Sequence, residues 1–143
     1  MLTLAIIKPD AVQAGNAGKI LAHLETAGFT VRAARLVKLS PAQAEDFYAV
    51  HRERPFYRSL VTFMTSGPAL ALALERADAV AQLRQVIGAT DPAEAQPGTV
   101  RKLYAESKER NAIHASDSVP NAAREVAFFF PESELRELWG DRP

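Results

Sequence analysis

The strongest constraint on the fold is the order in which strand-like and helix-like segments alternate along the chain. Four short segments have the length and composition of strands, at residues 2–8, 30–39, 69–75 and 112–116, and the second of them has an alternating pattern. Segments with helical spacing lie around them, at residues 17–28, 40–50, 55–64, 77–88, 119–130 and 132–139. The order is βαββαβ with additions. It predicts an α/β protein of the α+β type, a ferredoxin-like fold with a four-stranded antiparallel sheet covered by helices.

Capping residues mark several of the predicted helix ends. Ser40 and Gln43 form a capping-box pattern at the start of one helix, and Ser118 offers an N-cap to the last long helix. Gly88 stands where a C-terminal glycine belongs. Neither the alternation of a strand nor the spacing of a helix is visible over residues 89–110, so we expect a long loop there. Loops of this length are often functional.

Composition limits the class of protein. A chain of 143 residues that is 48% hydrophobic predicts a single domain, residues 1–143, with its own core. A net charge of zero argues against dedicated nucleic-acid binding. The chain has no cysteine, no leader-like start and no run near the roughly 20 apolar residues of a membrane span. We therefore expect a soluble, cytoplasmic protein with no membrane partner.

One of the three histidines stands out as a candidate for chemistry. His114 lies at the end of the last predicted strand, and its small neighbours leave the ring accessible. Glu125 interrupts the apolar line of the following helix, so its carboxylate is expected to face inward and to need a partner. If Glu125 holds one imidazole nitrogen, the other is free as a base or nucleophile. A purely structural histidine at a strand end explains the residues equally well.

Three cationic side chains would form a binding site for a polyanion such as a triphosphate if the fold brings them close to His114. Singly, each is more often a solvated surface charge. The cations are Lys8, Arg84 and Arg101, and the neutral partners are Thr90, Asn111 and Tyr48, with Phe56 as a flat stacking surface.

Other chemistries fit the sequence poorly. The segment "GNAGKI" at residues 15–20 has two residues between its glycines and Ile20 after Lys19, whereas a P-loop needs four and then Ser or Thr. Scattered histidines without cysteine show no metal-ligand spacing, and no nucleophile elbow is present.

A set of motifs in order resembles the nucleoside diphosphate kinase family. The motifs are "IIKPDAV", "FYAVHRERPFY", "FMTSGP", "GATDP", "PGTVR" and "NAIHASDS", and they extend from Leu2 to about Phe130. The resemblance implies a ferredoxin-like fold and transfer of the terminal phosphate of a nucleoside triphosphate to a nucleoside diphosphate. It implies a ping-pong mechanism through phosphohistidine. The alternative is a catalytically weak nucleotide- or nucleic-acid-binding interaction protein on the same fold.

The resemblance also assigns roles by position. His114 would be the phosphorylated nucleophile, with Glu125 and Ser116 orienting it from behind. Phe56 would stack on the base, and His51 would line the site. The residues that hold phosphates and ribose hydroxyls would be Lys8, Tyr48, Arg84, Thr90, Arg101 and Asn111, with Lys8 and Tyr48 close to the chemistry.

The family resemblance further implies Mg²⁺, carried by the nucleotide phosphates rather than by protein side chains. It implies a homo-oligomer, either a hexamer or a tetramer. Pro92 lies in the loop that packs between subunits of hexameric members, which favours a hexamer.

The chain departs from the family pattern at three positions. Ala115 stands where glycine usually follows the nucleophile, Leu103 replaces an acidic residue, and Lys108 stands where an apolar residue often covers the base. We expect ordinary extended backbone at Ala115. We also expect the small side chains of Ala112 and Ala115 to leave room for a phosphate. Base selectivity should be low, because stacking reads a flat face rather than base edges.

Overall fold

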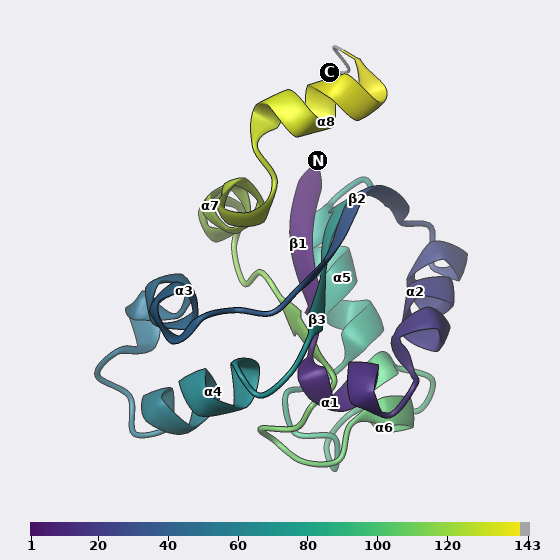
Figure 1. Cartoon of the computed structure of the whole chain (residues 1–143). Coiled ribbons are helices and arrows are strands. Elements are labelled where there is room, and N and C mark those ends of the chain that lie inside the picture. Colours follow the sequence, from purple (N-terminus) through teal and green to yellow (C-terminus); the bar gives the residue numbers. More distant parts are fainter. Residues whose placement is uncertain (141–143) are drawn as a thin grey trace.

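The computed structural model describes residues 1–140 and contains a four-stranded antiparallel sheet with helices on both faces (Figure 1). The strand order is β2-β3-β1-β4, and the predicted fold class is confirmed. The strands are β1 (Leu2–Ile7), β2 (Thr30–Val37), β3 (Ala69–Glu75) and β4 (Ile113–Ala115). The helices are α1 (Pro9–Gln13), α2 (Ala17–Thr26), α3 (Pro41–Phe47), the 3₁₀ helix η1 (Ala49–His51), α4 (Tyr57–Met64), α5 (Ala79–Ile87), α6 (Val100–Tyr104), α7 (Val119–Phe129) and α8 (Glu132–Trp139).

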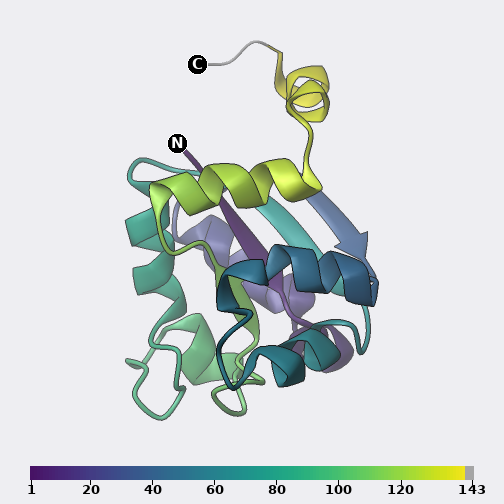
Figure 2. The same cartoon turned by 90° about the vertical axis from the view of Figure 1, so that its left-hand side faces the viewer.

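The central strand β1 is buried on both faces, which explains its continuous apolar run. Leu4 and Ile6 point into a core shared with α3, α4 and α7, which cover the sheet in Figure 2. Ala5 and Ile7 point into a second core shared with α2 and α5 on the opposite face. Alternate residues of a strand face opposite sides, so each side chain of β1 belongs to one core or the other.

The pairing of β1 with β4 decides which face carries His114. Ile6 pairs with His114, and Ala5 pairs with Ala115. His114 therefore lies on the face covered by α3, α4 and α7, whereas Ala115 belongs to the core on the other face.

The local capping signals are confirmed. Ser40 and Gln43 form a reciprocal capping box at the start of α3, and the Ser118 hydroxyl accepts the Asn121 N–H at the start of α7. Gly28 and Gly88 follow α2 and α5 with positive φ, as helix-ending glycines do.

Short elements were not visible in the periodicity. The first strand ends at Ile7, and Lys8 is the N-cap of α1, which has five residues. The expected loop over residues 89–110 contains α6, which is also five residues long and is capped by Thr99. A helix of this length shows little more than one turn of its pattern.

Two expected helix boundaries were wrong near α3 and α4. The helix expected over 40–50 ends at Phe47 and is followed by η1, which contains His51. The helix expected over 55–64 begins only at Tyr57. The chain turns between these helices at η1 and residues 52–56, and only the start of α3, with its capping box, was marked in the local sequence.

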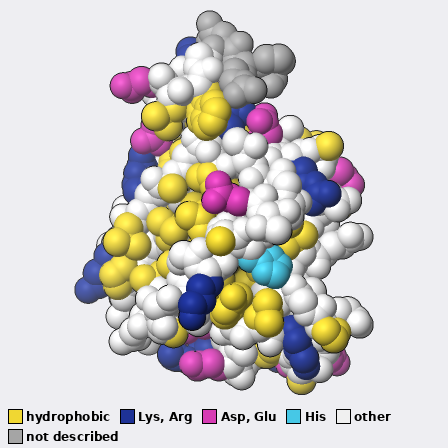
Figure 3. All heavy atoms as spheres, turned by 90° about the vertical axis from the view of Figure 1, so that its right-hand side faces the viewer, with side chains coloured by type: hydrophobic (Ala, Val, Ile, Leu, Met, Phe, Trp, Pro, Cys, Tyr) yellow, Lys and Arg dark blue, Asp and Glu magenta, His cyan; other side chains and the backbone are white. Residues whose placement is uncertain are grey.

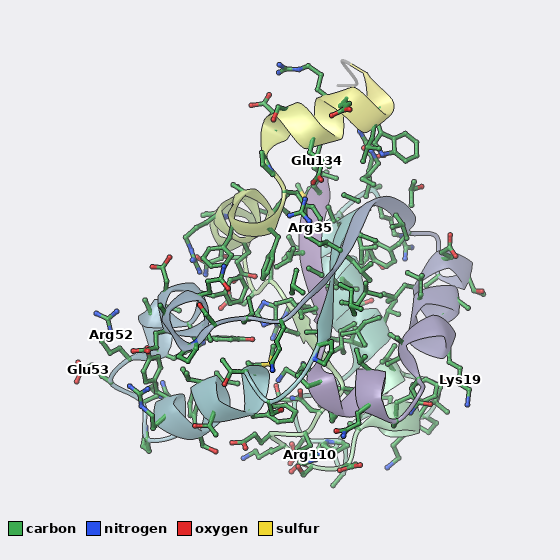
Figure 4. All side chains as sticks on the ribbon, in the orientation of Figure 1. Lys19, Arg35, Arg52, Glu53, Arg110 and Glu134 are labelled. Carbon is green, nitrogen blue, oxygen red and sulfur yellow. The ribbon has the colours of Figure 1, made fainter. Side chains whose placement is uncertain are left out.

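Helix α8 packs against β2, where Arg35 and Glu134 point toward each other (Figure 4). The Trp139 indole donates to the Arg32 carbonyl at 2.6 Å. Side chains of both charge signs are scattered over the face in Figure 3. Among residues 1–140, no helix is long and apolar enough to cross a membrane.

Candidate active site

The His114 imidazole is held from behind by α7. Its Nε2 lies 2.7 Å from Glu125 Oε1, and the Ser116 hydroxyl donates to the same oxygen at 2.8 Å. Glu125 is 6% exposed, and the inward orientation expected for it is present. The ring meets Phe47 and Tyr48 edge-on, with centroid distances of 5.4 and 6.0 Å. The His114 side chain retains 18% exposure, so part of the ring is open to a ligand.

This arrangement determines which ring nitrogen can react. Burial raises the pKa of Glu125, but the hydrogen bond and charge of His114 and the bond from Ser116 outweigh it and leave the pKa lowered. Glu125 is therefore an ionised acceptor, and in the neutral ring Nε2 must carry the proton that it donates. Nδ1 is left with its lone pair available.

Arg101 on α6 ties the loop to the strand that carries His114. Its guanidinium donates to the Gly88 carbonyl at 3.0 Å and to the Ile113 carbonyl at 2.7 Å. Burial, together with the neighbouring charge of Arg84, lowers the pKa of Arg101 to about 10. Arg84 itself is exposed on the last turn of α5. Cations from two helices thus lie close enough to influence each other, as a polyanion site requires.

Lys8 brings a third cation to the same region from the end of β1. It is 7% exposed, with its ammonium 6.0 Å above the Phe63 ring. Burial and, to a smaller extent, the charge of Arg101 lower the pKa of Lys8 to about 8, against the opposing charges of Asp10 and Glu109. Two buried cations that repel each other favour binding of an anion between them.

Several buried polar atoms here have no hydrogen-bond partner among the described residues. They include the Tyr48 hydroxyl, Asn111 Oδ1 and Arg101 Nε. Burial raises the pKa of Tyr48, and the charge of Glu125 adds to this, so its hydroxyl keeps its proton and remains a donor. Asn111 Nδ2 donates to the Thr90 carbonyl at 3.3 Å. Unpaired buried polar groups are rare in native proteins, and these three belong to residues that the family resemblance assigns to nucleotide binding, so a polar ligand is a natural partner for them.

Phe56 and His51 form a separate aromatic pair at the start of α4. Their ring centroids lie 5.4 Å apart, and Phe56 is 42% exposed. The Arg54 guanidinium lies 5.5 Å from the Phe56 ring centroid. Arg54 was missed in the sequence, although it stands two residues before Phe56 in "RERPFY" and Arg commonly stacks on aromatic faces.

The expectation that Ala112 and Ala115 leave room for a phosphate was wrong. Both side chains lie in the core against α2 and α5, across the sheet from His114. The extended backbone expected at Ala115 is confirmed, because it lies in β4 without a positive φ. It is Ala112 that adopts the left-handed region, with a φ of 74°.

A groove of about 410 Å³ lies beside α4 and borders the site at Phe63, over whose ring the Lys8 ammonium lies. Ser59 on α4 and Glu109 on the loop line it, and the Ser59 hydroxyl donates to Glu109 Oε2 at 2.6 Å. Arg110, at the lower edge of the molecule in Figure 4, also lines it and stacks on Phe63. None of the anion-site residues described above lines this groove, so we place the chemistry at His114 rather than here.

Comparison with known proteins agrees with this geometry. The family model for nucleoside diphosphate kinase matches residues 2–135. The chain belongs to the nucleoside diphosphate kinase family. A nucleoside diphosphate kinase of Chlorobium chlorochromatii is 57% identical over 133 residues, which cover 93% of this chain and 95% of the relative. That of Sorangium cellulosum is 56% identical, with 93% and 92% covered.

Solved structures of the family share the fold. The Aquifex aeolicus nucleoside diphosphate kinase is 45% identical with a TM-score of 0.91, and 93% of this chain and 96% of that one are covered. The Halobacterium salinarum enzyme in complex with CDP is 40% identical with a TM-score of 0.89, covering 94% and 90%. As a member of this family, the chain transfers the terminal phosphate of a nucleoside triphosphate to a nucleoside diphosphate, and its substrates are nucleotides.

Proposed function

We propose that this kinase works by a ping-pong route through phosphohistidine at Nδ1 of His114. The main observation in support is the hydrogen bond from Nε2 to the buried Glu125 carboxylate, which leaves Nδ1 with a free lone pair. That lone pair attacks the γ-phosphorus, and the bond to the β-phosphate oxygen breaks. The nucleoside diphosphate leaves with the electron pair of that bond. A second diphosphate then takes the phosphoryl group from Nδ1 by the reverse steps, which regenerates neutral His114.

Glu125 supports both half-reactions. Attack by Nδ1 makes the ring cationic, and the ionised carboxylate at 2.7 Å stabilises that charge through the Nε2 proton. Ser116 donates to the same carboxylate oxygen and restricts how it can turn. Both residues act on the ring and neither is proposed to contact the phosphate.

Charge neutralisation of the phosphates comes from several elements. Phosphoryl transfer asks a protein mainly for positioning and for electrostatic stabilisation. We assign that task to Lys8, Arg84 and Arg101, with hydrogen bonds from Tyr48, Thr90 and Asn111. Mg²⁺, a hard cation that prefers oxygen, would be held by the nucleotide phosphates and would neutralise part of their charge. Among residues 1–140, no three His, Asp or Glu side chains gather as a metal site.

The base would stack on Phe56, with His51 beside it. Phe56 is exposed and lies at the start of α4, where its ring can receive a flat partner. Arg54 already covers one ring face, so the base would use the other face or replace Arg54. Stacking of this kind tolerates any base.

The proposal includes a homo-oligomer, a hexamer or a tetramer, acting in the cytoplasm on the nucleotides there. The free edge of β2, on which Leu36 is 63% exposed, offers unpaired backbone groups for association between copies. Light scattering on the purified protein measures the subunit number, and a monomer at micromolar concentration would contradict this part.

The decisive experiment isolates the covalent intermediate. The protein is mixed with a nucleoside triphosphate and Mg²⁺ without acceptor, and acid-labile phosphate on the protein is measured. We expect one phosphoryl group per chain in the wild type and in His23→Ala, because His23 lies on α2 away from the site. His114→Ala should form none and should lose at least about a thousandfold in turnover, since that corresponds to only about 4 kcal/mol of barrier. Normal turnover in His114→Ala would exclude the phosphohistidine route.

A further inference from the structure

A buried carboxylate on α1 has no part in the mechanism above. Asp10 is 6% exposed, and its Oδ2 accepts the backbone N–H of Ala112 at 3.1 Å across 102 residues of sequence. The carbonyl of the same Ala112 accepts the backbone N–H of Lys8 at 2.8 Å. The backbone N–H and the carbonyl of Ala112 are therefore both hydrogen-bonded to the segment that follows β1.

The residue held in this way has an unfavourable backbone conformation. Ala112 has a φ of 74°, in the left-handed region that its Cβ disfavours. Such conformations persist only where the surrounding structure over-determines them, and they gather at functional sites. Ala112 is fully buried, so water cannot replace a lost partner of its N–H.

The position of Ala112 in the chain makes its conformation matter. Asn111, immediately before it, turns its side chain toward the Thr90 carbonyl. The carbonyl of Ile113, immediately after it, receives the Arg101 guanidinium, and His114 follows. A change in φ at Ala112 rotates Asn111 relative to Ile113 and His114, so groups that must meet the same phosphates would separate.

We propose that Asp10 is a positioning residue for phosphoryl transfer, which acts by locking Ala112 in the left-handed conformation that sets Asn111 against His114. Asp10 contacts no reacting atom in this role. The inference rests on the proposed phosphohistidine mechanism only for the identity of the reacting nitrogen. A competing role is electrostatic, because the Asp10 carboxylate lies near the Lys8 ammonium and could act through charge.

The two roles separate in a small set of variants. Asp10→Asn keeps an oxygen acceptor and loses the charge, whereas Asp10→Ala loses both. Ala112→Gly removes the need for a lock, because glycine enters the left-handed region without penalty. Asp78→Gly is the matched control, since Asp78 is exposed, has a φ of 53° and caps α5 away from the site.

We expect Asp10→Ala to lower kcat/KM by about 10- to 100-fold, because small misplacements are costly in this chemistry. Asp10→Asn should stay within about threefold of the wild type, a difference of about 0.6 kcal/mol. Adding Ala112→Gly to Asp10→Ala should restore most of the loss, and adding Asp78→Gly should restore none. NMR chemical shifts of Ala112 report its backbone conformation and should move in Asp10→Ala but not in Asp10→Asn.

Equal damage in Asp10→Asn and Asp10→Ala, or equal rescue by both glycine substitutions, would overturn the inference. If Asp10→Ala alone is too unstable to assay, the two double variants are compared directly. Activity only in the one with Ala112→Gly supports the lock, and equal activity or none in either one refutes it. Phosphorylation of the wild type is measured first, and its absence would defeat the phosphohistidine route while the steady-state comparison still tests Asp10.

Discussion

At the scale of single residues, Lys8 shows how function and stability oppose each other. Burial, with a contribution from Arg101, lowers its pKa to about 8 from an ordinary value of 10.5. The folded protein thus resists the charge on Lys8 that the phosphates need. Its unfolded chain binds more protons between pH 8 and 10.5, so this residue makes the folded state more stable as pH rises through that window.

We therefore expect opposite trends in activity and stability above pH 8. In the wild type, kcat/KM should fall above about pH 8, because Lys8 of the nucleotide-free enzyme loses its proton there. The decline in kcat should come at higher pH, because bound phosphates raise the pKa of the ammonium. Steady-state rates and urea unfolding across pH 6–10 measure both trends. Lys8→Gln should abolish the decrease in kcat/KM above pH 8. Lys19→Gln, on the exposed side of α2, should leave that decrease unchanged. A wild-type kcat/KM that stays constant up to pH 10 would contradict the assignment of this titration to Lys8.

Ala115 is the departure from the family pattern closest to the chemistry, and the structure changes the reason for its size limit. Its side chain packs opposite His114, beside its strand partner Ala5. Ala115→Gly should have little effect on turnover. Ala115→Val should overpack this core and cost about 1–3 kcal/mol of stability. Thermal unfolding and activity at low temperature test this, and a valine variant as stable as the wild type would refute the packing argument.

At the scale of elements, the turn from α5 to α6 places Arg101. Gly88 ends α5 with a φ of 89°, and its carbonyl accepts from Arg101. A Cβ added at Gly88 would lie 2.5 Å from the hydroxyl oxygen of Thr99, which caps α6. The start of α6, the end of α5 and the position of Arg101, which we propose to bind phosphate, therefore depend on the absence of a single side chain.

Gly88→Ala should consequently damage both stability and activity. Strain at positive φ costs about 1–2 kcal/mol, and disturbing the Thr99 cap costs about 1 kcal/mol more. The control is Gly28→Ala, which has a φ of 96° and only ordinary contacts with Arg76. Both variants should have a lower Tm, but only Gly88→Ala should lose kcat/KM, because only there is Arg101 displaced. Equal kcat/KM in the two variants would argue against this coupling.

At the scale of the whole molecule, the residues that we propose to bind the nucleotide come from elements far apart in sequence. Tyr48 follows α3, Arg101 lies on α6 and Asn111 precedes β4, and each holds a buried polar atom without a partner in residues 1–140. A nucleotide that bonds to all three would link elements that are distant in sequence. It binds only the native state, so it should raise Tm by mass action.

The size of that shift should depend little on the base. At equal concentration with Mg²⁺, we expect ADP, GDP, CDP and UDP to raise Tm within about 6 °C of one another, the span of a tenfold affinity difference, about 1.4 kcal/mol. Phe56→Ala should reduce all four shifts alike, whereas His114→Ala should retain them, because binding does not need the transfer step. A stabilisation confined to one base would reveal readout of base edges.

Features that depend on neighbours within one helical turn could be read from the sequence. The capping box of Ser40 with Gln43 and the glycine at the end of α5 are interactions between residues close along the chain, so they survive in any fold. The continuous apolar run of β1 likewise agrees with its burial on both faces. The roles of His114 and its partners came from the family resemblance, because physical reasoning alone left a structural histidine equally possible.

Other features depended on the register of the sheet and could not be predicted locally. Pairing of β4 with β1 placed His114 and Ala115 on opposite faces, which made the expected phosphate space at Ala115 wrong. The same pairing brings the Ala112 N–H to Asp10, a contact between residues 102 apart. The sequence of a strand shows which side chains share a face of the sheet, but not which helices cover that face. Only the packed sheet decides that, because a shift of one residue in pairing reverses every side chain.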